Sequence, residues 1–253
     1  LLQINPGAGR SDGRANDHAA FFQDDWRPTP NLTLNFGIRY EYYQPWIDEK
    51  DNFSTFTTGA GAKAGAFPQG VLVQAGTPAA EAAGFTGRAR RSLYFPDRRD
   101  WGPRAGLAWR PFTADGAVLR AAYGVYFTPV TFVIHWPHET APAAGIQVNS
   151  LLSGPVFLSR PIPPFDGDFG KLSGFVLANN FVTGYVQQWN LTAQRRIAKD
   201  TGVEIRYLGN KGTHLDAVFR LANQAFPGLT PPATRRRFPS FSTYPLIDSS
   251  ASS

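Results

Sequence analysis

The longest regular pattern in the chain runs from Leu32 to Tyr43, where apolar and polar side chains alternate over twelve residues. The even positions read Leu, Leu, Phe, Ile, Tyr and Tyr, whereas the odd positions include Arg39 and Glu41. Successive side chains of a β-strand point to opposite faces, so the segment is predicted to be a strand with one apolar face. Strands of globular proteins average about five or six residues, whereas a membrane-spanning strand needs roughly nine to eleven. The length of the pattern therefore favours a strand that crosses a membrane.

The same alternation predicts three hairpins with short turns, at about 18–43, 101–127 and 185–208. The segments after them are long and rich in Gly, Ala and Pro, at about 44–100, 128–184 and 216–253. Compact soluble domains rarely contain structureless loops beyond about 12–15 residues, whereas short turns on one side and long loops on the other are typical of bacterial outer-membrane barrels. We therefore expect an all-β chain that forms part of one domain, a transmembrane antiparallel β-barrel. It would contribute about six strands and long extracellular loops.

The composition of the two strand faces supports the same interpretation. The apolar faces end in aromatic residues, as the interfacial girdles of membrane barrels do. The opposite faces carry charges that suit a wet lumen, and four arginines are predicted to face it: Arg39, Arg104, Arg120 and Arg206. A soluble or surface β-sandwich, such as a lectin-like binding module without transport activity, would show the same period and remains an alternative. The sandwich would dissolve without detergent, whereas six barrel strands would form an open, curved sheet with poorly ordered loops.

Several other classes of function lack support in the sequence. The chain has no Cys, which excludes disulfides and thiol chemistry, and it contains no catalytic motif, so we predict neither an enzyme nor a cofactor. His135 and His138, like Asp166 and Asp168, lack the further ligands of a metal site. The net charge is +6, but no nucleic-acid motif accompanies the basic clusters. These clusters, at 88–91, 98–99 and 235–237, are expected in solvent or against anionic lipopolysaccharide.

Three collinear stretches resemble a known family. FFQDDWRPTPNLTLNFGIRYEYYQPW (21–46), WGPRAGLAWRPF with VLRAAYGVYF (101–127) and YVQQWNLTAQRRIAKDTGVEIRYLGNKGTHL (185–215) are similar to hairpins of TonB-dependent outer-membrane receptors. The likeness is greatest to the carboxypeptidase-regulatory-domain, Oar-like type. The resemblance implies a 22-stranded barrel occluded by an N-terminal plug, in the outer membrane of a Gram-negative-type bacterium. It further implies uptake of a scarce nutrient, energised through TonB.

The chain itself shows no plug and no TonB-contacting segment, so we expect an internal fragment of such a barrel. The resemblance implies outer-membrane lipid, lipopolysaccharide, a plug and TonB as partners, with a siderophore, oligosaccharide or peptide as ligand and no nucleic acid. The lumen arginines would then pair with carboxylates of the plug or of neighbouring strands, or contact the ligand. Loops on a rigid scaffold carry function, and aromatic faces supply contact area. We therefore predict ligand contacts at Trp46, Tyr94, Trp136 and His138.

Overall fold

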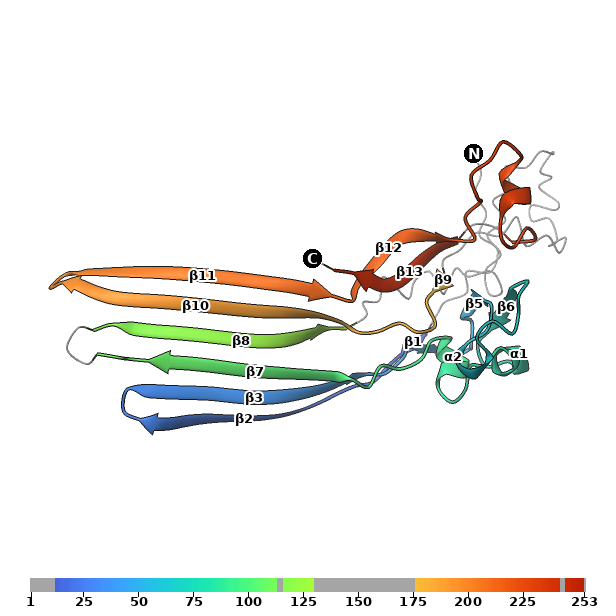
Figure 1. Ribbon diagram of the computed structural model, residues 1–253. Coiled ribbons are helices and arrows are strands. Elements are labelled where there is room, and N and C mark those ends of the chain that lie inside the picture. Colours follow the sequence, from blue (N-terminus) through green and yellow to red (C-terminus); the bar gives the residue numbers. More distant parts are fainter. Residues whose placement is uncertain (1–11, 113–115, 130–175, 242–243, 253) are drawn as a thin grey trace, which may run out of the picture.

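Six long strands lie side by side in one sheet and account for most of the length of the molecule (Figure 1). The computed structural model describes residues 12–112, 116–129, 176–241 and 244–252. The strands of the sheet are β2 (Asp17–Thr29), β3 (Leu32–Tyr43), β7 (Asp100–Trp109), β8 (Val118–Thr128), β10 (Gly184–Ala198) and β11 (Thr201–Thr213). Their order in the sheet, β2-β3-β7-β8-β10-β11, follows the chain, and every neighbouring pair is antiparallel. The three predicted hairpins are therefore confirmed, and they join edge to edge.

The third hairpin is longer than the sequence predicts. Its pairing continues to Tyr185 opposite Thr213, five residues past the expected end at 208. The added stretch contains Gly209 and Gly212. Gly209 lies directly opposite Trp189, and a Cβ on it would collide with the Trp189 indole. The missing side chain is what lets the large ring lie flat against the sheet.

The register assigns each side chain to one of two faces. Arg104 lies between Gly37 and Gly124 of the neighbouring strands, and Thr192 lies between Arg120 and Arg206. On the opposite face, one row crosses five strands through Leu34, Leu107, Ala121, Leu191 and Tyr207. The four arginines share one face and the apolar residues share the other, as the alternation predicts.

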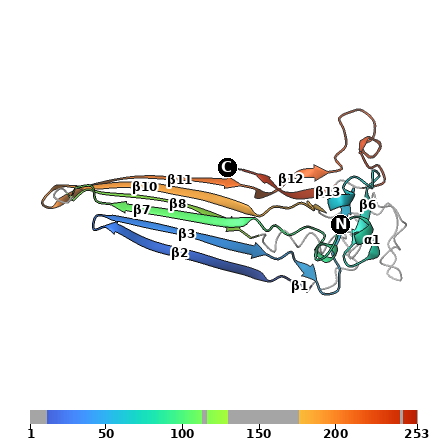
Figure 2. The ribbon, with the colours of Figure 1, turned by 60° about the horizontal axis from the view of Figure 1, so that its bottom comes forward.

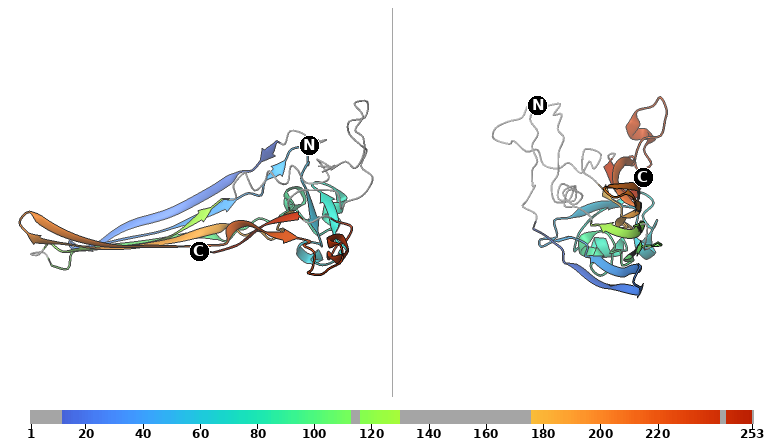
Figure 3. Two further views of the ribbon diagram at one scale, coloured as in Figure 1. Left: turned by 90° about the horizontal axis from the view of Figure 1, so that it is seen from above. Right: turned by 90° about the vertical axis from the view of Figure 1, so that its left-hand side faces the viewer.

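The apolar face is open to its surroundings. Its large side chains are widely exposed, for example Phe36 at 42%, Leu191 at 51% and Ile205 at 70%. The smaller sheets gather at one end of the long strands and cover neither face (Figure 2). The six strands form an open, curved sheet with β2 and β11 at its edges, each paired on one side only within the described residues (Figure 3). A β-sandwich would bury this face under a second sheet, so the sandwich alternative is wrong.

Aromatic residues bound the apolar face at both ends. Near the long segments, the Tyr40 and Trp101 rings lie 4.5 Å apart, and those of Phe127 and Tyr185 lie 5.7 Å apart. Near the short turns, Trp109 pairs with Leu32. Residues 101 and 109 lie eight positions apart on β7, or about 26 Å at roughly 3.3 Å per residue. At a tilt near 40° this spans about 20 Å of membrane thickness, close to the roughly 25 Å apolar band of outer-membrane barrels.

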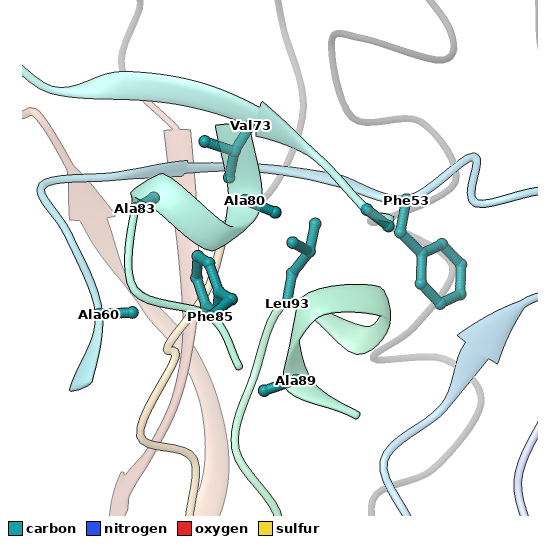
Figure 4. Packing of buried hydrophobic residues seen from close by; sticks show 9 residues of the cluster. Phe53, Ala60, Val73, Ala80, Ala83, Phe85, Ala89 and Leu93 are labelled. Carbon is teal, nitrogen blue, oxygen red and sulfur yellow. The ribbon is translucent and has the colours of Figure 1, made fainter. Parts of the chain in front are cut away.

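The segment after the first hairpin is folded, which corrects the expectation of a long loop at 44–100. It contains β4 (Ile47–Asp48), β5 (Ser54–Thr57), η1 (Gly61–Lys63), β6 (Val71–Gln74), α1 (Pro78–Ala82) and α2 (Ala89–Ser92). We call residues 47–95 the first-loop unit. Its core packs small residues such as Ala60, Ala80 and Ala83 against Phe85 and Leu93, all fully buried (Figure 4). The Ala-rich composition, which suggests a loop, instead allows the core to pack closely. Among the described residues, no helix has the length and apolarity of a membrane-spanning helix.

The other segments at this end are also structured where they are described. β13 (Tyr244–Ala251) pairs with both β12 (Leu215–Ala222) and β9 (Val176–Leu177), and η3 (Pro232–Arg235) lies between β12 and β13. The short β1 (Gly13–Arg14) pairs with β4. The expectation of a loop over 216–253 is therefore wrong for β12 and β13. We refer to this side of the sheet as the loop end.

A charge on the apolar face should disrupt assembly, whereas the same charge on the polar face should not. Phe36→Arg in the full-length protein would place a cation in the middle of the apolar face, because Phe36 pairs with Ala105, halfway between residues 101 and 109. Such a cation costs about 2–4 kcal/mol near mid-bilayer. Asn35→Arg is the matched control, because Asn35 shares the polar face with Asp25 and donates a 2.5 Å hydrogen bond to it. We expect heat-resistant folded protein in the outer membrane to fall sharply for Phe36→Arg only. Equal yields of the two variants would contradict the assignment of faces.

Candidate functional site: the polar wall and the loop end

Two of the four arginines on the polar face are compensated by carboxylates. Arg39 lies 2.9 Å from Glu41, two residues along the same strand and on the same face. Arg206 pairs with Glu204 in the same way on β11. Both pairs combine opposite charges two positions apart, which the period of two brings together. These arginines contribute little net charge to the wall.

Arg104 and Arg120 have no carboxylate within ion-pair distance among the described residues. The Arg104 guanidinium lies 4.8 Å from the centre of the Tyr126 ring, a cation–π contact. That ring lies over Gly124, where a Cβ would come within 2.9 Å of it. Arg120 donates a 3.3 Å hydrogen bond to the Gln194 side chain. Of the four predicted lumen arginines, two therefore stay without a carboxylate partner among the described residues, and they lie on the adjacent strands β7 and β8.

One face of the sheet is apolar and the other is polar, which is the pattern of a barrel wall between lipid and water. A sequence model of the family described as "Outer membrane beta barrel domain" matches residues 2–253. The chain belongs to this family. Its location is accordingly the bacterial outer membrane. Because outer-membrane barrels turn apolar residues to lipid and polar residues to the interior, we expect the apolar face toward lipid and the polar face toward the barrel interior. No curated protein and no solved structure matched the sequence.

In outer-membrane barrels the short turns are periplasmic and the longer connections extracellular. The loop end of this barrel domain is therefore its extracellular side. Three connections meet there, and backbone and side-chain hydrogen bonds join them. Phe95 N donates to Asn179 O at 2.9 Å, and the Thr183 hydroxyl donates to Asp100 at 2.9 Å. Val182 N donates to the Ser249 hydroxyl at 3.1 Å, so residues 179–183 connect the first-loop unit to β13.

Two of the predicted ligand residues meet, but at the edge of the first-loop unit, where Trp46 directly precedes it. The Trp46 backbone N–H donates a 2.9 Å hydrogen bond to the Tyr94 hydroxyl. Tyr94 is buried, and this burial raises the pKa of its hydroxyl, so it stays protonated. Trp46 is half-buried and packs against the core cluster. Both residues therefore stabilise the first-loop unit. Because Tyr94 is buried, its side chain is not exposed to a ligand, which corrects the predicted ligand contact at this residue.

The other predicted site residues lie outside the described part of the chain. Trp136 and His138 fall within 130–175, and so do His135, Asp166 and Asp168. Among the described residues, no group of three or more His, Asp or Glu side chains could hold a metal ion.

The basic clusters have a role that the sequence did not indicate. Arg88 donates to Pro45 O at 2.8 Å and Arg91 pairs with Asp51 at 2.6 Å, while Arg90 donates to Gly76 O. Burial lowers the pKa of the Arg88 guanidinium from its usual value. The cluster at 235–237 acts similarly: Arg235 donates to Thr230 O and Phe226 O, Arg236 donates to Phe241 O, and Arg237 lies over the Phe238 ring. These arginines bind the folded connections themselves and are therefore more than solvated loop charges, while contact of the clusters with lipopolysaccharide stays a prediction.

The first-loop unit should unfold locally when its core is truncated. Phe53 is 1% exposed, and Phe53→Ala removes a ring at a cost of about 3–5 kcal/mol. We expect much faster tryptic cleavage after the exposed Lys63 in intact cells, because cleavage follows the population of the open form. Phe112→Ala is the control, since Phe112 is 63% exposed in a short turn. Unchanged cleavage of Phe53→Ala would mean that the unit does not fold as a cooperative core.

Proposed function

We propose that this barrel domain belongs to an outer-membrane receptor of TonB-dependent type, which takes up a scarce nutrient with energy supplied through TonB. The observation that carries the proposal is the collinear resemblance of three stretches to hairpins of such receptors. Each resembling stretch coincides with one of the hairpins β2–β3, β7–β8 and β10–β11. The resemblance therefore follows whole structural units, turns included, and does not rest on isolated residues.

Two arginines without carboxylate partners on the polar face are consistent with an acidic partner that passes through the barrel or blocks it. Arg104 and Arg120 occupy adjacent strands and lie four positions apart in register, because Arg104 faces Gly124. This is about 13 Å along the strand at roughly 3.3 Å per residue. In this proposal the two cations pair with carboxylates of a plug inside the barrel or, when the plug moves, with the passing ligand. Charge-assisted hydrogen bonds of this kind are stronger than neutral ones.

Two measurements on the full-length protein test the proposal. A TonB-dependent receptor should form a complex with the purified periplasmic domain of TonB from the same bacterium. It should also show little steady conductance in a planar bilayer, because a plug closes it. The opposite pair of results, an open pore without TonB binding, would identify a passive channel and overturn the proposal.

A further inference from the structure

Two carboxylates hold the segment before β10 against the rim of the barrel wall. The Thr183 hydroxyl donates a 2.9 Å hydrogen bond to Asp100, and the Thr183 backbone N–H donates one of 3.3 Å to Asp97. Asp100 begins β7 and Thr183 directly precedes β10, whereas β8 lies between these two strands in the sheet (Figure 1). The two hydrogen bonds therefore reach across the loop end of β8. We call Asp97, Asp100 and Thr183 the rim clasp.

The rim clasp secures a segment that also contacts the other connections. Val182 N donates to the Ser249 hydroxyl of β13, and Phe181 N donates to Ala178 O at 3.2 Å. Asn179 is bonded separately to the first-loop unit. Opening of the clasp would therefore free the backbone N–H groups of residues 181–183, while residue 179 stays in place.

Asp100 is a buried carboxylate without a cation of its own. Its exposed fraction is 1%, and no Arg or Lys lies within ion-pair distance of it among the described residues. The two nearest arginines along its surroundings are already paired, Arg39 with Glu41 at 2.9 Å and Arg99 with Asp97 at 3.1 Å. A buried charge without a partner is costly, and such a group becomes neutral by a shift of its pKa.

Two further carboxylates face Asp100 and add to this cost. Glu41 lies directly opposite it on β3, and Asp97 lies three residues before it in the chain. One row further out on the same face, Tyr43 pairs in register with Asp17. Like charges at close range disfavour ionisation. The segment before β10 presents no charge to Asp100, only the hydroxyl of the clasp.

These surroundings raise the pKa of the Asp100 carboxyl from its ordinary value of 3.8 to about 6. Burial is the main cause, and the charges of Asp97 and Glu41 act in the same direction. The hydrogen bond from Thr183 and the charge of Arg99 lower the pKa, but they are outweighed. In an open clasp the carboxyl would return to water and to its ordinary pKa.

The two pKa values link the clasp to protons. A carboxyl with the higher pKa in the closed form binds its proton more tightly there, so acid favours closing. This stabilisation is complete below about pH 4 and is lost as the pH rises through 6. The ratio of closed to open clasp should fall about 50-fold from pH 4 to pH 7. Because Asp100 lies on the extracellular side of Trp101, outside the apolar band, the relevant pH is that of the external medium.

We propose that the rim clasp is a proton-controlled device that holds residues 181–183 on the barrel wall in acidic medium and releases them as the medium becomes neutral. Asp100 takes up one proton on closing and gives it back to water on opening. The protonated carboxyl keeps the contact with Thr183, because its carbonyl oxygen still accepts from the hydroxyl. The device acts on the fold of the loop end and does not depend on TonB.

Hydrogen exchange of the full-length protein in lipid bilayers tests the proposal. Exchange of the backbone N–H groups of residues 181–183 is followed by mass spectrometry from pH 4 to pH 7, and each rate is divided by the rate of the unfolded chain at the same pH. The protection of these groups should fall about 50-fold over this range.

Three variants assign the effect to the clasp. Asp100→Asn keeps the shape of the side chain but cannot ionise, so its protection should not change with pH. Glu41→Gln removes the facing charge and should move the loss of protection to lower pH. Glu49→Gln is the matched control, because Glu49 is an exposed carboxylate of the first-loop unit, and it should behave as the wild type.

Three results would overturn the proposal: constant protection in the wild type, a wild-type loss of protection in Asp100→Asn, or an unmoved profile in Glu41→Gln. If Asp100→Asn fails to assemble in the membrane, the shift in Glu41→Gln decides alone, because that variant keeps Asp100 itself. Absence of a TonB complex would leave each of these results unaffected.

Discussion

The hydrogen-bonded register of the six strands is the constraint on which the rest of the structure depends. In lipid every backbone donor and acceptor must be satisfied within the protein, which strands achieve only by pairing. A slip of one residue would exchange the two faces, moving Arg104 to lipid and Tyr123 to water. The observed pairing of Arg104 with Gly124 and of Tyr123 with Trp189 therefore fixes the chemistry of both walls at once.

The loop end is held together by a different kind of interaction from the sheet. Its connections have few long strands, and arginine–carbonyl hydrogen bonds together with Ala-rich packing hold them. Arg88, for example, reaches Pro45 O across 43 positions of sequence, and Asn179 reaches Gly59 O across 120. Such contacts turn three separate connections into one rigid surface.

The strands could be predicted from the sequence because their information is local. Alternation along Leu32–Tyr43 assigns a face to each residue without reference to any partner. The loop end could not be predicted, because its short helices and strands carry no long period and its contacts are distant in sequence. Gly209 shows the same limit within the sheet: it lies beyond the predicted end of the hairpin, and only the opposing Trp189 explains a glycine at this position. Trp46 and Tyr94 were both predicted as ligand contacts, whereas their hydrogen bond to each other and the burial of Tyr94 follow from packing that the sequence does not display.

The alternation of lipid-facing and water-facing positions along a single strand gives the most direct test of the assigned faces. The chain has no Cys, so single cysteines from position 34 to position 39 on β3 can each carry a nitroxide spin label in the full-length protein. Collision rates with oxygen, which concentrates in lipid, and with a water-soluble nickel chelate are then measured in bilayers. The account predicts that labels at 34, 36 and 38 meet oxygen and labels at 35, 37 and 39 meet nickel. Rates without a period of two would contradict it.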